Sequence, residues 1–351
     1  MRHSPYNVPV AETNQILQDL LTRRVLLLDG ATGTELTRRG VPTPLPLWST
    51  DALRTHPDVV RAIHRDYAEA GADIIVANTF RSNVRALREA ELFDQGEALN
   101  RRAVELARQG VEDGVAKGVS HGGDSLRATP DPEHGGDRGA PDEDHVGEST
   151  GHRAEQPLVA VSIAPVEDCY HPERVPDERT LDEEHGQMLA WLSAAGPDVV
   201  WIETMNTVRE ARAAAQAAGR ERLPMIVSFV VRENGDLLSG ESLEDAVAAV
   251  EPFAPIALGL NCIPPDGVTR NLSRLRAATD RPLIAYAHIG NAEPTHGWSF
   301  RQDVSPEQYV EHAQRWIEIG ARIVGGCCGT TPEYISALRK FLNTSQSATA
   351  V

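Results

Sequence analysis

Three of the four cysteines in this 351-residue chain stand where a metal site can form. Cys327 and Cys328 are adjacent in a Gly-Gly-Cys-Cys-Gly segment, and Cys262 ends a short apolar run in Gly-Leu-Asn-Cys. A catalytic zinc ion keeps three protein ligands and one open position, and thiolates bind it at about 2.3 Å. We therefore predict a zinc site formed by Cys262, Cys327 and Cys328. The alternative is that they are small buried apolar residues, as free cysteines often are.

Adjacent side chains of a regular strand point to opposite faces, so Cys327 and Cys328 could not share an ion there. The glycines around them, Gly325, Gly326 and Gly329, are expected to let the backbone curl and direct both sulfurs inward. The fourth cysteine, Cys169, has no such support in its sequence, and we expect it not to be a ligand.

A zinc ion held by three thiolates is a weak activator of water, but it still lowers the pKa of a bound thiol. This chemistry favours a thiol substrate whose sulfur attacks an electrophilic carbon. The carboxylates of Asp29 and Glu203 would then bind the ammonium group of an amino-acid thiol. Taken singly, Asp29 could instead cap a helix, and Glu203 could pair with an arginine.

The elements that must position these residues form a regular alternation. Eight short apolar runs predict strands, and each is followed by an amphipathic helical pattern. The strands are expected at 25–29, 74–77, 158–163, 199–203, 225–230, 257–261, 283–286 and 322–326; the helices are expected at 58–70, 98–113, 181–195, 208–218, 243–250, 268–278, 306–320 and 332–341. Eight such units most simply close into a single (β/α)8 TIM barrel, and an open doubly wound sheet is the alternative.

Polar residues stand at the carboxyl ends of several of these strands, where barrel enzymes build their active sites. The candidate catalytic and metal-binding residues are Cys262, Cys327 and Cys328. The candidate substrate-binding residues are Asp29, Asn78, Thr79, Glu203 and Asn261. Because parallel strands end on one face of a barrel, we expect all of these side chains to meet in one mouth.

Composition limits the remaining possibilities. The net charge of −17 repels nucleic acid and anionic lipid, and no apolar run is long enough to span a bilayer. We expect a cytoplasmic protein that binds neither nucleic acid nor membrane; the oligomeric state is left open, a homo-oligomer included. The barrel is predicted over residues 20–342, with an acidic Gly/His-rich and disordered insertion at 119–156 and a flexible tail at 343–351.

Several of these segments together resemble the homocysteine S-methyltransferase family, which includes betaine-homocysteine methyltransferase and the homocysteine domain of methionine synthase. The resemblance is carried by Leu-Asp-Gly-Ala-Thr-Gly-Thr at 28–34, Ala-Asn-Thr-Phe at 77–80, Ile-Glu-Thr at 202–204, Gly-Leu-Asn-Cys at 259–262 and Gly-Gly-Cys-Cys-Gly-Thr at 325–330. It implies a barrel with Zn²⁺ bound by Cys262, Cys327 and Cys328, and homocysteine held through its amino group by Asp29 and Glu203.

The resemblance also implies the reaction: a methyl donor passes its methyl group to L-homocysteine, giving L-methionine, a step of methionine biosynthesis. A sulfonium such as S-methylmethionine or S-adenosylmethionine is the expected donor, and Phe80 and Trp298 are candidates for a cation–π contact with it. Betaine or another onium donor is the alternative. A non-catalytic thiol or zinc redox sensor, and a hydrolytic or lyase barrel using Asp29 and Glu203, are alternatives from other functional classes.

Overall fold

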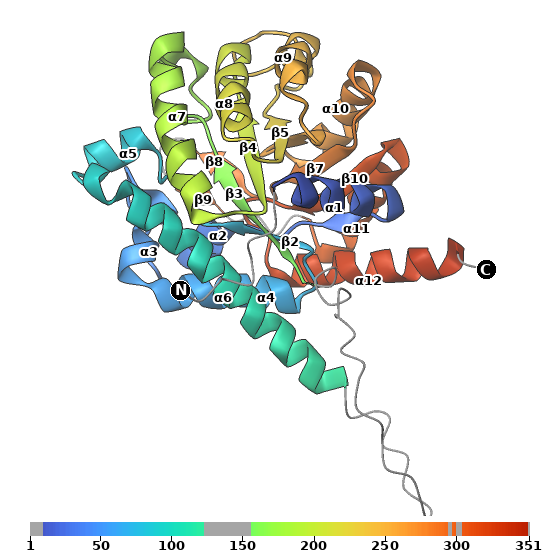
Figure 1. Cartoon of the computed structure of the whole chain (residues 1–351). Coiled ribbons are helices and arrows are strands. Elements are labelled where there is room, and N and C mark those ends of the chain that lie inside the picture. Colours follow the sequence, from blue (N-terminus) through green and yellow to red (C-terminus); the bar gives the residue numbers. More distant parts are fainter. Residues whose placement is uncertain (1–9, 123–155, 294–296, 300–303, 350–351) are drawn as a thin grey trace, which may run out of the picture.

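A computed structural model describes residues 10–122, 156–293, 297–299 and 304–349 (Figure 1). Eight parallel strands form one sheet in the spatial order β1-β10-β7-β6-β5-β4-β3-β2. A parallel bridge between Leu28 and Ile74 joins the two outermost strands and closes the ring. The fold is therefore the predicted (β/α)8 barrel. Its strands are β1 (Leu26–Leu27), β2 (Ile74–Ala77), β3 (Leu158–Ile163), β4 (Val199–Met205), β5 (Met225–Phe229), β6 (Ala257–Asn261), β7 (Leu283–Ala287) and β10 (Ala321–Gly326).

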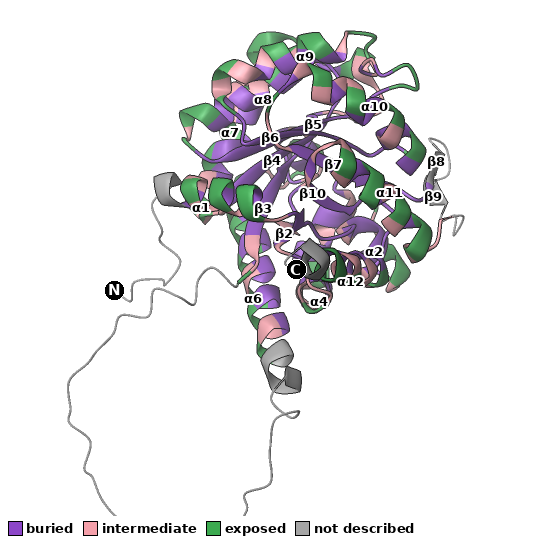
Figure 2. Ribbon diagram, turned by 90° about the vertical axis from the view of Figure 1, so that its right-hand side faces the viewer, coloured by how far each residue is buried: buried purple, intermediate pink, exposed green. Residues whose placement is uncertain are grey.

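Helices surround the strands, and their exposed residues face outward while their buried residues face the sheet (Figure 2). The helices that follow successive strands are α4 (Pro57–Glu69), α6 (Gly96–Gly122), α7 (Glu178–Ala195), α8 (Val208–Arg220), α9 (Leu243–Val250), α10 (Pro265–Ala278), α11 (Pro306–Ile319) and α12 (Pro332–Thr349). Shorter helices α2 (Thr32–Arg38), α3 (Ala52–Thr55) and α5 (Val84–Glu89), and a hairpin of β8 (Asn291–Glu293) with β9 (Gly297–Ser299), complete the connections. None of the described helices is long and apolar enough to cross a membrane.

The apolar core has two parts because side chains alternate between the two faces of each strand. In β1, Leu27 packs outward into the layer between strands and helices, whereas Leu26 and Leu28 fill the barrel interior. Leu17 and Leu21 of α1 (Val10–Arg23) belong to the same interior cluster and are almost completely buried. The interior is thus a packed core.

The ends of the chain differ from the expected boundaries. Helix α1 begins at Val10, ahead of residue 20, and α12 continues to Thr349 through most of the segment 343–351 that we expected to be a flexible tail. Residues 119–122 of the expected insertion form the end of α6, a long helix that projects from the barrel (Figure 1). Residues 123–155 of the insertion lie outside the described residues.

Candidate active site

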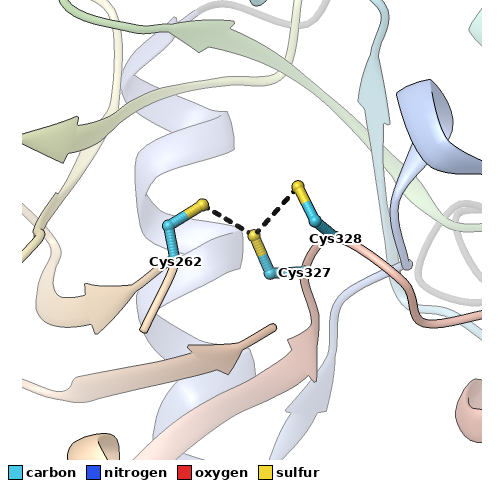
Figure 3. Close-up of side chains that lie close together, drawn as sticks. All are labelled: Cys262, Cys327 and Cys328. Carbon is cyan, nitrogen blue, oxygen red and sulfur yellow. Dashed lines mark hydrogen bonds between the residues drawn. The ribbon is translucent and has the colours of Figure 1, made fainter. Parts of the chain in front are cut away.

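The three predicted cysteines meet at the carboxyl end of the barrel. Cys262 follows β6, and Cys327 and Cys328 follow β10; all three are buried. The Sγ atoms of Cys262 and Cys327 are 2.8 Å apart, those of Cys327 and Cys328 are 4.0 Å apart, and all three lie within 4.8 Å of one another (Figure 3). Among the described residues, this is the one group of three or more histidine, cysteine and acidic side chains placed to share an ion. Cys169 is not in the group.

The backbone explains how two adjacent cysteines direct their sulfurs to one point. Strand β10 ends at Gly326, so the alternation of side chains no longer applies to Cys327 and Cys328. A tight turn follows, in which the Thr330 amide donates to the Cys327 carbonyl at 3.0 Å and Gly329 has a φ of +89°. Glycine at the third position of such a turn is what the type II conformation requires.

The sequence indicated that all three glycines would adopt unusual backbone conformations, but only Gly329 has a positive φ. Gly325 is required for space: a Cβ atom there would lie 2.6 Å from the Cβ of Leu28. Cys262, in contrast, has a positive φ of +53° without being glycine. Such backbone strain is uncommon and tends to occur at functional sites.

The contacts within the sulfur cluster favour one thiolate. Hydrogen bonds from Cys262 and Cys327 lower the pKa of Cys328 well below that of an ordinary cysteine. The same contacts raise the pKa of Cys262, and burial raises that of Cys327. Negative charge is therefore drawn to Cys328, and a cation would be needed before all three sulfurs could ionise together.

Asp29 and Glu203 are the two buried acids of this mouth. Oδ2 of Asp29 accepts a hydrogen bond from the Val76 amide at 2.8 Å, but Oδ1 has no hydrogen-bond partner among the described residues. Burial raises the pKa of Asp29 well above its usual value; the hydrogen bond from Val76 opposes this rise, and the charge of Glu203 adds to it. Burial likewise raises the pKa of Glu203 to about 7. Neither acid forms an ion pair with a described arginine, lysine or histidine.

The other three candidate residues hold neighbouring protein groups. Asn261 donates to Oε2 of Glu203 at 3.3 Å and accepts from the Thr204 amide at 3.0 Å. The Thr79 hydroxyl donates to the Ser162 carbonyl at 2.9 Å. The side-chain oxygen of Asn78 accepts from the Ser49 hydroxyl at 2.7 Å, and its amide donates to the Ser49 carbonyl at 2.8 Å. These side chains connect the strand ends to one another and to the loop around Ser49.

A family model described as homocysteine S-methyltransferase matches residues 26–342. The chain belongs to the homocysteine S-methyltransferase family. A homocysteine S-methyltransferase of Escherichia coli (strain K12) is 30% identical over 336 residues, which cover 93% of this chain and 98% of the relative. A selenocysteine methyltransferase of Astragalus bisulcatus is 29% identical over 345 residues, covering 93% and 95%. The metallated form of the homocysteine methyltransferase MmuM from Escherichia coli matches with a TM-score of 0.74 and 28% identity, covering 93% of this chain and 99% of that one.

Two residues of this homocysteine S-methyltransferase family member escaped the sequence interpretation. The Ser162 hydroxyl donates to Oε1 of Glu203, and together with Asn261 it fixes both oxygens of that carboxylate. Tyr170 follows Cys169 in the loop after β3, and its hydroxyl lies 3.5 Å from the Cys262 carbonyl oxygen. Neither contact has a local signal, because each joins residues at least 41 positions apart.

Trp48 was also missed, although its backbone marks it: its φ of +48° is rare for a bulky residue. The indole packs against the interior cluster that contains the three cysteines and meets Phe80 edge to face, with ring centroids 5.8 Å apart. Both rings are partly exposed. The side chain of Trp298, the other aromatic candidate, lies outside the described residues.

The sulfur cluster fits a zinc ion. Zinc at about 2.3 Å from each of three sulfurs in tetrahedral geometry separates them by roughly 3.8 Å, and the two separations given above lie on either side of that value. The donor set is all sulfur, which selects a soft or borderline cation over magnesium or calcium. The contacts that lower the pKa of Cys328 raise that of Cys262, so a bound cation would favour the ionised form of all three thiols.

Proposed function

We propose that this protein transfers a methyl group from a sulfonium donor, such as S-methylmethionine or S-adenosylmethionine, to the sulfur of L-homocysteine, giving L-methionine. Family membership supports the reaction class. The observation that carries the proposal is one mouth holding three clustered sulfurs and two buried acids that have no cationic partner among the described residues. That combination suits a substrate with a thiol at one end and an ammonium group at the other.

Cys262, Cys327 and Cys328 would hold zinc, which when bound lowers the pKa of a substrate thiol and keeps it as the nucleophilic thiolate. In the transfer, the bond from the donor sulfur to its methyl carbon breaks as the bond from that carbon to the homocysteine sulfur forms. The donor leaves as a neutral thioether, and the proton of the homocysteine thiol is released before transfer. The positive charge of the donor is thereby cancelled by the thiolate.

Asp29 and Glu203 would bind the ammonium group of homocysteine. A cation placed between them would supply the partner that Oδ1 of Asp29 lacks and would lower the pKa of both acids toward ordinary values. Ser162 and Asn261 hold both oxygens of Glu203, so that this carboxylate meets the substrate in a fixed orientation. Asn78, Thr79 and Asn261 therefore support binding by positioning their neighbours.

The donor side would be formed by Trp48 and Phe80. A sulfonium over an aromatic face gains cation–π attraction, which is strongest for tryptophan and grows when water is excluded. The two hydrogen bonds between Asn78 and Ser49 hold the segment that carries Trp48. A positively charged donor is thus favoured over a neutral one, and the same rings would also suit a quaternary ammonium such as betaine.

The test is a donor panel. Purified protein is incubated with homocysteine and, separately, S-methylmethionine, S-adenosylmethionine and betaine, and methionine is measured by mass spectrometry. Methionine formed with a sulfonium supports the proposal. Methionine formed only with betaine would show that the donor is betaine and that the sulfonium assignment is wrong. A redox sensor would instead form no methionine with any donor, and mild oxidation would release its metal and produce a disulfide.

A further inference from the structure

The loop that follows β3 contacts the backbone beside the sulfur cluster. We call residues 164–177 the β3 loop. Its Cys169 carbonyl accepts a hydrogen bond from Asn206 at 2.9 Å, and its Tyr170 hydroxyl lies 3.5 Å from the Cys262 carbonyl oxygen. Burial raises the pKa of the Tyr170 phenol, and the neighbouring charge of Cys262 raises it further. Tyr170 is therefore next to the sulfur cluster, although it lies on a loop.

The first part of this loop is held by a buried acid from a different element. Oε1 of Glu210, in the first turn of α8, accepts a hydrogen bond from the Val166 amide at 2.8 Å. The same oxygen lies 3.2 Å from Nε2 of His185 on α7. The Val166 carbonyl accepts from Asn83 at 3.5 Å, so both backbone polar groups of Val166 are held by side chains.

This contact is poorly explained as a device for stability. The side chains of Glu210 and His185 are 0% and 1% exposed. Oε2 of Glu210 and Nδ1 of His185 have no hydrogen-bond partner among the described residues. Burying polar atoms without partners costs free energy, and an apolar pair of the same size is often at least as stable. What the pair does provide is a fixed acceptor for one backbone amide of the β3 loop.

We propose that Glu210, braced by His185, is a positioning residue that sets the β3 loop so that Tyr170 completes the pocket for the amino-acid thiol. Four residues of extended chain reach at most about 14 Å, and the contacts at Val166 and at the Cys169 carbonyl hold both ends of the segment that leads to Tyr170. Glu210 acts through the loop and does not touch the substrate. The inference rests on the proposed function for the identity of the substrate, but the loop contact itself does not depend on it.

The kinetic test compares Glu210→Ala, which removes the acceptor, with Glu210→Gln, which keeps an oxygen for the Val166 amide. We expect Glu210→Ala to raise KM for homocysteine about tenfold with kcat within a factor of about three, and Glu210→Gln to restore KM. In a Tyr170→Ala background, Glu210→Ala should add little, because the two residues act in one chain of contacts. An unchanged KM in Glu210→Ala would overturn the proposal. So would a double variant whose rise in KM equals the product of the two single-variant rises.

A second readout needs neither methyl transfer nor metal. In metal-free protein, the rate at which iodoacetamide alkylates the three cysteines of the sulfur cluster is followed by peptide mass spectrometry. Glu210→Ala should raise this rate several-fold, and Glu210→Gln should not. Leu338→Ala, a fully buried site on α12, controls for a general loss of stability. Equal rates in wild type and Glu210→Ala, or an equal rise in Leu338→Ala, would refute the loop anchor. Absence of methionine with every donor would instead refute the proposed function.

Discussion

The acids at the two ends of the barrel have opposite surroundings. At the amino ends of the strands, Asp73 accepts from the Leu27 amide and pairs with both Arg24 and Arg339 at 2.7 and 2.6 Å. At the carboxyl ends, Asp29 and Glu203 also accept hydrogen bonds from their neighbours, but no described arginine or lysine pairs with them.

This difference indicates that the acids at the amino ends stabilise the fold, whereas those at the carboxyl ends serve the site. The charge of Asp73 is neutralised within the chain, and so is that of Asp198, which pairs with Arg108 at 3.2 Å and accepts from the Val159 amide at 2.7 Å. These contacts fasten neighbouring strands. The acids of the mouth have no cationic partner in the part of the chain that the structure describes, which is why we propose that a ligand supplies it.

The largest expected effect is on activity, at the mouth. Glu203→Gln and Asp29→Asn each keep the shape of the side chain but remove its charge. Loss of one partner of a buried charge pair costs about 2–5 kcal/mol, which corresponds to a roughly 30-fold to several-thousand-fold fall in kcat/KM for homocysteine. Steady-state kinetics with homocysteine as the varied substrate measures this, and a fall of less than about threefold in both variants would remove these acids from the site.

Glu203→Gln should not lower the free energy of unfolding. The folded-state pKa of Glu203 is raised from 4.5 to about 7, so its stabilising contribution is present below pH 4.5 and is lost as the pH rises through about 7. At pH 8, Glu203→Gln should therefore leave the free energy of unfolding of the metal-free protein unchanged or increase it. A clear loss of stability in urea melts would contradict the comparison.

Asp73→Asn should show the reverse pattern at the other end of the barrel. It leaves Arg24 and Arg339, which are 30% and 20% exposed, without their shared carboxylate. Unpaired buried groups cost about 1–3 kcal/mol, and we expect the lower end of that range because these two are only partly buried. Urea melts should show that loss, while KM and kcat stay within about twofold of wild type at a temperature where the variant is folded. A specific rise in KM for homocysteine would show that the two ends are not separate.

The pH profile sharpens the comparison further. Protonated Glu203 cannot pair with an ammonium group, and its pKa of about 7 places the change near neutrality. kcat/KM for homocysteine, which reports the free enzyme, should fall below pH 7 by up to tenfold per unit. Glu203→Gln should lose this acid limb, whereas Asp73→Asn should retain it. An acid limb that persists unchanged in Glu203→Gln would assign it to another group.

The smallest effect is expected on the donor side. Phe80→Leu keeps an apolar side chain but removes the ring beside Trp48, and an exposed cation–π contact contributes about 0.5–1 kcal/mol. KM for the sulfonium donor should rise about two- to fivefold, with KM for homocysteine unchanged. A rise in KM for homocysteine alone would place the ring on the other side of the pocket.

Much of this molecule could be predicted from local patterns. All eight strands of the barrel lie within a few residues of the expected apolar runs, because fully buried parallel strands are continuous apolar segments. The meeting of Cys262 with Cys327 followed from the same topology, since strand ends converge on one face. Helix α1 and the end of α12 were not predicted, although α1 buries Leu17 and Leu21 one helical turn apart.

The supporting contacts could not be predicted, because they depend on the path of loops. Ser162 reaches Glu203 across 41 positions and Glu210 reaches Val166 across 44, and nothing in either sequence neighbourhood specifies the pairing. The turn at Cys328 was predicted in part, since only one of the three glycines adopts a positive φ. The strand simply ends before the cysteines, and one glycine with a positive φ completes the turn.

The central claim is that three of the four buried cysteines form a zinc site, and metal analysis tests it most directly. Wild-type protein should contain about one zinc per chain, and Cys262→Ala and Cys328→Ala should lose both the zinc and methionine formation. Cys169→Ala, a buried thiol outside the sulfur cluster, is the matched control and should keep the full zinc content. A full complement of zinc in both Cys262→Ala and Cys328→Ala would contradict the account.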